Sequence, residues 1–100
     1  MGVVKISGWQ EVLGWKGECF FLDVRPRTQY EIIHFKPRDR KVVHIAWEEL
    51  KTFGEGKCRE SLGEQGKIFC FCRKGVDSLV ATAYLNSLGI GECENVSGGL

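Results

Sequence analysis

Short, nearly continuous apolar runs recur along the chain, and each is bounded by charged or turn-forming residues. The clearest are residues 19–24 and 68–71, whose length and composition are typical of strands buried on both faces of a sheet. Weaker strand patterns occur at residues 3–6, 42–45 and 92–96. The pattern therefore predicts about five short strands.

Segments with helical periodicity lie between these runs. Capping-box spacings at residues 7–10 and 28–31 predict the starts of the first two helices. Further helices are predicted over residues 46–53 and 78–88, whereas the Gly-, Glu- and Lys-rich residues 54–66 predict a loop with a weak helical turn. Strands that alternate with helices favour an α/β fold with a central parallel sheet and helices on both faces.

One stretch, residues 67–78, joins a predicted buried strand to the last predicted helix. Cys72 opens the turn between them, which we predict to extend to Asp77. A tight turn before a helix N-terminus directs backbone N–H groups inward and forms an anion-binding cradle. The partial positive charge of the helix end, with Arg73 and Lys74 beside it, favours the thiolate over the thiol. Cys72 is therefore a candidate nucleophile.

The composition and charge are those of an ordinary globular chain. Its 100 residues provide for one hydrophobic core, since 43% are apolar and 27% are charged. No apolar run approaches the roughly 18 residues that span a bilayer, and the N-terminus has no signal-peptide pattern, so we expect a cytoplasmic protein without membrane partners. A net charge of +1 gives no general attraction to nucleic acid. Residues 36–41 form a basic cluster that either is solvated or docks an acidic partner.

The five cysteines do not form the pattern of a disulfide framework, because their number is odd and no secretory signal precedes them. Cys70 and Cys72 are separated by one residue, which is not a zinc-knuckle spacing, and Cys58 and Cys93 provide no second pair. We therefore expect no metal. Cys70 is either a buried structural thiol or the partner of Cys72 in a redox-active dithiol.

Other polar residues are candidates for supporting roles. Asp23 lies at the C-terminal end of a predicted strand, where a parallel sheet presents its ligand crevice. It is either a carboxylate at the rim of the site or a structural partner of Arg25 or of loop N–H groups, since buried charges are tolerated mainly when paired. His34 and His44 are the only histidines, and each is either a base that the fold brings to Cys72 or a histidine with no catalytic part.

Five segments occur in the order and spacing of a known family. They are Phe21-Leu-Asp-Val-Arg-Pro26, Gln29-Tyr-Glu-Ile32, Ile45-Ala-Trp-Glu-Glu-Leu50, Cys72-Arg-Lys-Gly-Val-Asp-Ser78 and Asn95-Val-Ser-Gly-Gly-Leu100. Together they resemble a rhodanese domain and cover nearly the whole chain. Within that family they most resemble the C-terminal rhodanese domain of the E1-like enzymes that adenylate and sulfurate ubiquitin-like sulfur carriers.

The resemblance implies that Cys72 takes sulfane sulfur from a donor, holds it as a persulfide and passes it to an acceptor nucleophile or activated carboxyl group, with no further cofactor. The implied cradle for the persulfide is Arg73, Lys74, Gly75, Val76, Asp77 and Ser78. The implied partners are a protein persulfide donor such as a cysteine desulfurase and a ubiquitin-like sulfur carrier, in molybdenum cofactor biosynthesis or tRNA thiolation, without direct contact to nucleic acid.

Two positions and one segment distinguish this chain from the usual family pattern. Many rhodaneses carry Arg at the position of Asp77, so a carboxylate there is expected to repel thiosulfate and to favour a protein donor. Ala46 stands where the family commonly has Pro, and residues 36–41 are longer and more basic than the usual turn. Both changes alter the surface around the loop.

Two other functions are compatible with the resemblance. Phosphatases with this fold need Cys-x5-Arg, whereas this chain has Ser78 at the arginine position and Asp77 before it, which opposes phosphate binding. Non-enzymatic binding modules commonly lack the cysteine, which is present here. We expect residues 1–100 to form a single rhodanese-like domain. Because no closing helix follows the Gly98-Gly99 turn, we expect the sequence to be trimmed at this end or to be a fragment.

Overall fold

Within the part of the chain that the structure describes, five strands form one sheet in which all neighbours are parallel. The computed structural model describes residues 6–32, 35, 37, 40–63 and 66–97, so residues 3–5 of the first predicted strand lie outside its described part. The strand order is β1-β5-β4-β2-β3, which makes β4 the central strand. The strands are β1 (Ile6–Ser7), β2 (Cys19–Asp23), β3 (Lys41–His44), β4 (Lys67–Phe71) and β5 (Glu92–Val96). The predicted parallel sheet is confirmed.

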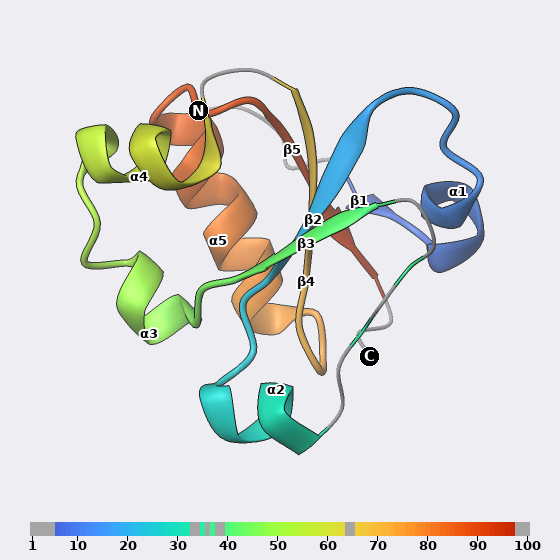
Figure 1. Ribbon diagram of the computed structural model, residues 1–100, viewed down its shortest axis with the longest axis horizontal. Helices are drawn as coiled ribbons and strands as arrows, with labels where there is room; N and C mark the ends of the chain where they lie inside the picture. Colours follow the sequence, from blue (N-terminus) through green and yellow to red (C-terminus); the bar gives the residue numbers. More distant parts are fainter. Residues whose placement is uncertain (1–5, 33–34, 36, 38–39, 64–65, 98–100) are drawn as a thin grey trace.

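Helices cover both faces of this sheet, as Figure 1 shows. Three of them, α3 (Trp47–Leu50), α4 (Glu55–Leu62) and α5 (Val76–Ser87), lie on one face, and α1 (Trp9–Leu13) lies on the other. The remaining helix, α2 (Arg27–Ile32), lies at the end of the sheet that the β4–α5 connection also occupies. None of these helices, within the described ranges, is long and apolar enough to cross a membrane.

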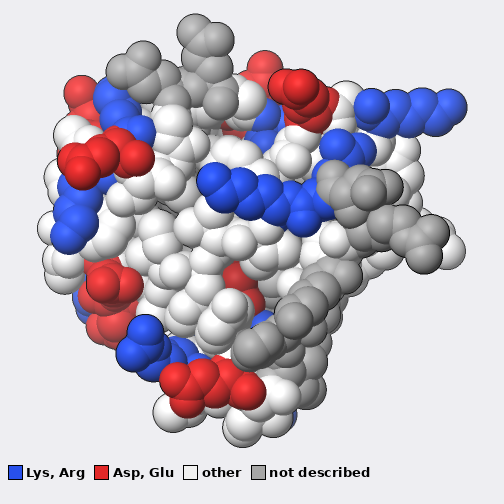
Figure 2. All heavy atoms as spheres, viewed as in Figure 1, with Lys and Arg blue, Asp and Glu red and all other residues white. Residues whose placement is uncertain are grey.

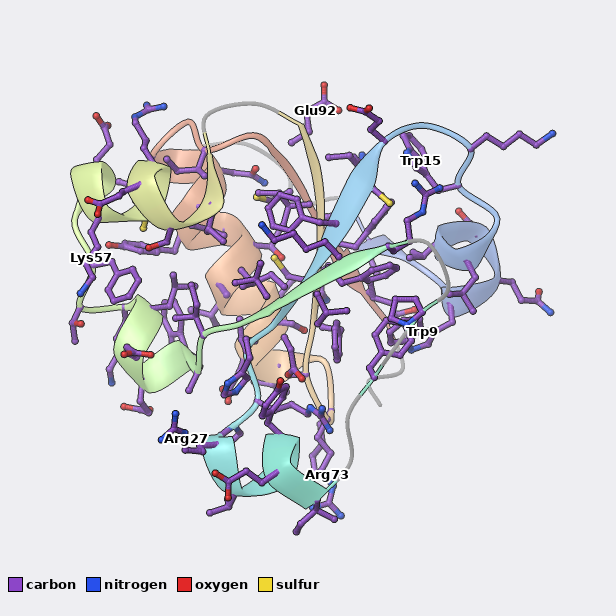
Figure 3. All side chains as sticks on the ribbon, viewed as in Figure 1. Trp9, Trp15, Arg27, Lys57, Arg73 and Glu92 are labelled. Atoms are coloured by element: carbon purple, nitrogen blue, oxygen red, sulfur yellow. The ribbon has the colours of Figure 1, made fainter. Side chains whose placement is uncertain are left out.

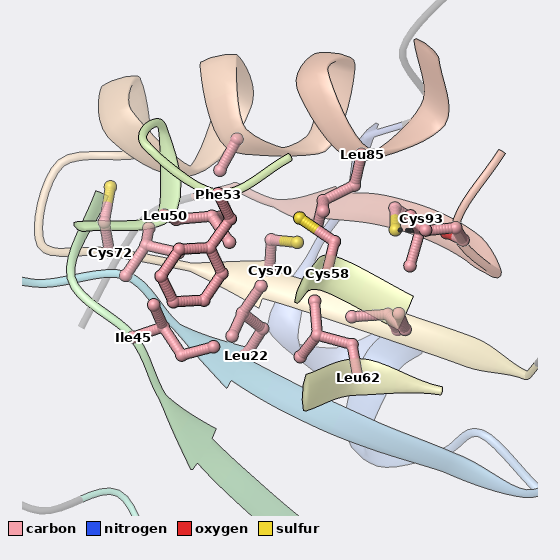
Figure 4. Packing of buried hydrophobic residues seen from close by; sticks show 14 residues of the cluster. Leu22, Ile45, Leu50, Phe53, Cys58, Leu62, Cys70, Cys72, Leu85 and Cys93 are labelled. Atoms are coloured by element: carbon pink, nitrogen blue, oxygen red, sulfur yellow. Dashed lines mark hydrogen bonds between the residues drawn. The ribbon is translucent and has the colours of Figure 1, made fainter. Parts of the chain in front are cut away.

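The alternation of side chains along β4 produces two separate cores. Ile68 and Cys70 belong to the core beneath α3, α4 and α5, which Figure 4 shows from close by. Phe69 and Phe71 belong to the second core, where they pack with Val12 of α1. All five residues of β4 are buried. The continuous apolar pattern of this strand is therefore the consequence of burial on both faces.

Both predicted capping boxes are wrong. Ser7 lies in β1, so the N-cap position of α1 falls on Gly8, which has no side chain to form a cap. The second helix starts directly after Pro26, whose carbonyl accepts the amide of Tyr30 at 3.1 Å. Thr28 therefore lies inside the first turn and is not the cap.

The loop predicted over residues 54–66 is wrong over most of its length, because α4 occupies residues 55–62, although the weak helical turn predicted within it lies inside this helix. Its sequence gives a weak amphipathic signal, since Gly56 lies near its start and its apolar residues are limited to Cys58 and Leu62. Cys58 and Leu62, one helical turn apart, are buried in the core beneath the helix. Tertiary packing of these two side chains, more than local propensity, fixes this helix.

Gly91, in the turn before β5, provides a test of the close packing at this end of the sheet. Its φ is +55°, and a Cβ added there would lie 2.7 Å from the carbonyl oxygen of Gly66. Gly91→Ala should lower the free energy of unfolding by about 2–3 kcal/mol, through the left-handed backbone and the clash. Gly56→Ala is the matched control, because its Cβ would meet nothing within 4 Å and the helix should gain about 0.5 kcal/mol. Equal urea midpoints for the two variants would contradict this account of the turn.

Candidate functional site

The connection from β4 to α5 is shorter than the sequence predicts. The chain leaves β4 after Phe71 and enters α5 at Val76, so the predicted helix start at Ser78 is wrong by two residues. Gly75 is the N-cap residue and has a left-handed conformation, with φ 83° and ψ 1°. Because this conformation turns the chain sharply, the next two residues already belong to the first turn of the helix.

The sulfur of Cys72 lies at the start of this helix and accepts two backbone hydrogen bonds. The N–H of Gly75 donates to Sγ at 3.0 Å and the N–H of Ser78 donates at 3.4 Å. The thiol in turn donates to the Ser78 hydroxyl oxygen at 3.3 Å. Only 4% of the Cys72 surface is exposed. Two of the six residues predicted to cradle a persulfide therefore already contact the sulfur.

A pocket of about 280 Å³ opens onto Cys72 at the end of the sheet where α2 lies. Figure 3 places Arg73 at this same end, with Arg27 nearby, and Trp15 and Glu92 at the opposite end. The residues that line the pocket are Pro26, Gln29, Cys72, Arg73, Lys74, Val76 and Asp77. The pocket thus surrounds a thiol with two cations and one carboxylate.

Asp23 and Arg25 form a buried ion pair beside the loop. The Arg25 guanidinium donates to both carboxylate oxygens, with Nη2 at 2.7 Å from Oδ2 and Nε at 3.0 Å from each, and the Arg25 N–H also donates to Oδ1 at 3.0 Å. The guanidinium lies over the ring of Phe71, 5.8 Å from its centroid. This is the geometry of the structural role that the sequence left open for Asp23. Neither residue is among those that line the pocket within the described chain.

His44 is held by contacts of its own. Its Nε2 donates to the Arg25 carbonyl at 2.8 Å, since a carbonyl oxygen only accepts. Its ring stacks on Tyr30, with 4.1 Å between ring centroids and 11° between planes. These contacts give His44 a structural place at the end of β3. His34 lies outside the described part of the chain.

All five cysteines are free thiols, and four of them are buried. Figure 4 shows Cys58, Cys70 and Cys93 among the apolar side chains of the larger core, with Cys72 at its edge. Burial raises the pKa of Cys58, and a hydrogen bond with Cys70 together with burial raises the pKa of Cys93. Burial also raises the pKa of Cys19. At neutral pH Cys19, Cys58 and Cys93 are therefore held as thiols.

Sequence reasoning missed Asn95, which lies in β5 and is 3% exposed. Its Oδ1 accepts the Ser78 hydroxyl at 2.5 Å, and its Nδ2 donates to the Gly75 carbonyl at 3.5 Å. The signal that could have found it is a polar amide inside a strand with a buried pattern. Gln29, which lines the pocket, was likewise given no role.

Positive and negative side chains are interspersed on the face of the molecule shown in Figure 2. That face therefore carries no broad field of one sign. Residues 36, 38 and 39 of the basic cluster lie outside the described part of the chain, so its predicted docking role stays a prediction.

Sequence comparison finds relatives whose names state both adenylyl and sulfur transfer. The chain is 32% identical over 81 residues to the adenylyltransferase and sulfurtransferase uba4 of Ogataea parapolymorpha, and 30% identical over 101 residues to the adenylyltransferase and sulfurtransferase MOCS3 of Arabidopsis thaliana. These alignments cover 81% and 92% of this chain but only 19% and 21% of the relatives' own lengths. No protein-family model matches the chain.

Solved structures show the same fold. The rhodanese-like domain of an Anabaena protein matches 97% of this chain and 70% of its own, with a TM-score of 0.76 and 19% identity. A human single-domain sulfurtransferase, TSTD1, matches 99% of this chain and 93% of its own, with a TM-score of 0.74 and 20% identity. The predicted fold is confirmed, and together with the sequence relatives it identifies the chain as a rhodanese-like domain related to sulfurtransferases.

Proposed function

We propose that the domain is a sulfurtransferase in which Cys72 carries sulfane sulfur as a persulfide. The observation that carries the proposal is the pair of backbone N–H groups, from Gly75 and Ser78, that reach the Cys72 sulfur at the start of α5. Donors fixed by the fold stabilise negative charge on sulfur without reorganising during the reaction. The pocket then gives a donor or acceptor access to that sulfur.

The proposed transfer loads sulfur onto Cys72 and then passes it to an activated carboxyl group. In loading, the Cys72 thiolate attacks the outer sulfur of a persulfide donor, a Cys72–sulfur bond forms, and the sulfur–sulfur bond of the donor breaks to release a thiolate. In transfer, the outer sulfur of the Cys72 persulfide attacks the activated carboxyl carbon of the acceptor, a sulfur–carbon bond forms, and the activating group leaves with its electron pair. A thiol then attacks the Cys72 sulfur of this acyl disulfide and releases the thiocarboxylate, and a second thiol releases the Cys72 thiolate from the mixed disulfide, so the two electrons needed come from two thiols.

The charges around the pocket favour a protein persulfide donor over thiosulfate. Arg73 and Lys74 attract an anion, but Asp77 lines the same pocket and is exposed in the first turn of α5. Its carboxylate repels a small dianion that must approach the sulfur closely. A donor such as a cysteine desulfurase, which delivers sulfur from a cysteine of its own, brings less charge to this point.

The outer surface of α5 supports a protein partner. Val76, Leu79 and Val80 are 63%, 37% and 46% exposed, and Val76 also lines the pocket. An apolar surface that begins at a reactive thiol is suited to burial against another protein. We propose that the acceptor is an activated ubiquitin-like sulfur carrier in the cytoplasm, in molybdopterin synthesis or tRNA thiolation. The names of the two sequence relatives, which pair adenylyl with sulfur transfer, support this acceptor.

Persulfide formation on Cys72 is tested by mass spectrometry of the intact chain after incubation with glutathione persulfide. We expect a gain of one sulfur atom that cyanide removes, since cyanide accepts sulfane sulfur. Cys72→Ala should abolish the gain, whereas Cys19→Ser should retain it because Cys19 lies at the other end of β2 from the loop. An unmodified wild-type chain would favour the non-enzymatic binding module.

The choice of donor is tested by Asp77→Arg, assayed as thiocyanate formation from thiosulfate and cyanide. Replacing the carboxylate with a guanidinium should raise kcat/KM for thiosulfate about tenfold, because the charge that faces the dianion changes by two units. Glu60→Arg makes the same change of charge on α4 and should have little effect on kcat/KM. Glu60 is next to Arg59, which contacts Leu88 at the far end of α5 from the thiol, so its charge is distant from the pocket. The interpretation of Asp77 fails if thiosulfate turnover does not rise above that of the Glu60 variant.

A further inference from the structure

Asn95 is buried near the Cys72 sulfur, and the proposed transfer gives this side chain no role. It lies in β5 and pairs with Cys70 of the central strand. Its side chain accepts from the Ser78 hydroxyl and donates to the Gly75 carbonyl. These are the same two residues whose N–H groups reach Cys72. These four residues, Cys72, Gly75, Ser78 and Asn95, therefore form a closed ring of hydrogen bonds.

Donor and acceptor chemistry fixes the direction of each bond in this ring. The Gly75 carbonyl can only accept, so it must face the NH₂ group of Asn95, which leaves Oδ1 toward Ser78. Oδ1 also can only accept, so the single hydroxyl proton of Ser78 points to Asn95. The Ser78 oxygen then presents lone pairs to Cys72, and the thiol proton lies on that side.

We propose that Asn95 is a positioning residue that holds the Ser78 hydroxyl as an acceptor toward Cys72, and thereby limits the donors available to an anionic sulfur. An anionic Cys72 sulfur accepts hydrogen bonds from the two backbone N–H groups, whichever way the Ser78 hydroxyl points. It gains a third donor only if the Ser78 hydroxyl rotates and gives up its 2.5 Å bond to Asn95.

This inference rests on the proposed function, since it concerns the same sulfur, and it explains why a buried amide is useful there. A sulfur anion that is stabilised more strongly is formed more readily but attacks more slowly. By keeping the Ser78 proton away from the sulfur, Asn95 leaves the persulfide reactive enough to be passed on.

The test measures the reactivity of Cys72 by alkylation with iodoacetamide at neutral pH, read at the Cys72 peptide by mass spectrometry. Asn95→Leu, which keeps the volume, and Asn95→Ala should each raise the rate about three- to fivefold. The freed hydroxyl donates to the thiolate, and at neutral pH the larger thiolate fraction outweighs the lower nucleophilicity of each thiolate. Ultraviolet thiolate absorbance, corrected with the Cys72→Ala chain, should rise in parallel. In a Ser78→Ala background the same Asn95 changes should have no effect, since the hydroxyl through which Asn95 acts is gone.

Asn86→Ala is the matched control. Asn86 also joins α5 to β5, through hydrogen bonds of 3.3 Å with the N–H and the carbonyl of Cys93, but it lies near the other end of the helix. It should leave the alkylation of Cys72 unchanged. Slower alkylation in the Asn95 variants, or an equal change with and without the Ser78 hydroxyl, would show a merely structural role. Because alkylation needs no sulfur donor, this result stands apart from the persulfide experiment, whose failure would overturn only the transfer.

Discussion

The left-handed turn at Gly75 is the constraint on which the arrangement around Cys72 depends. It places the Gly75 N–H 3.0 Å from the sulfur and the Gly75 carbonyl within reach of Asn95. A side chain at this position would meet nothing within 4 Å, so the need for glycine is conformational, on the order of 1–2 kcal/mol. The same turn starts α5 early enough for the N–H of Ser78 to reach the sulfur as the second donor. One backbone conformation thus orients both donors.

The parallel sheet gives this turn a rigid base. The carbonyl of Phe71, just before the cysteine, accepts at 3.1 Å the N–H of Val24, which directly follows the neighbouring strand β2. The chain that follows β2 is fixed by the buried pair of Asp23 and Arg25, which tolerates burial because the carboxylate accepts four hydrogen bonds from one partner. That pair sets the position of Pro26, which forms one wall of the pocket. The wall and the turn are therefore positioned by adjacent strands of one sheet.

The buried strands and the parallel sheet could be predicted from the sequence, whereas features set by contacts between particular elements could not. The buried strands and the placement of Cys72 follow from an apolar run that meets a helix start. Helix α4 was missed because its apolar periodicity is weak and its stability comes from Cys58 and Leu62 in a core built by other segments. Asn95 was missed for a related reason. Its role depends on the register between β5 and β4, which brings it beneath the first turn of α5, and no local pattern reports that register.

The outer faces of α4 and α5 differ in a way that bears on how partners reach Cys72. The outer face of α4 is solvated by charged residues: Glu55, Lys57, Arg59 and Glu60. Helix α5 is longer, yet its one charged residue is Asp77, and its exposed positions include Val76, Leu79 and Val80. Helix α4 lies away from the thiol, whereas α5 begins beside it. Since a helix face without charges is stabilised by burial, the surface beside the sulfur is the one that gains most from contact with another protein. This contrast within one chain supports the proposal that sulfur is exchanged with another protein and not with a small anion.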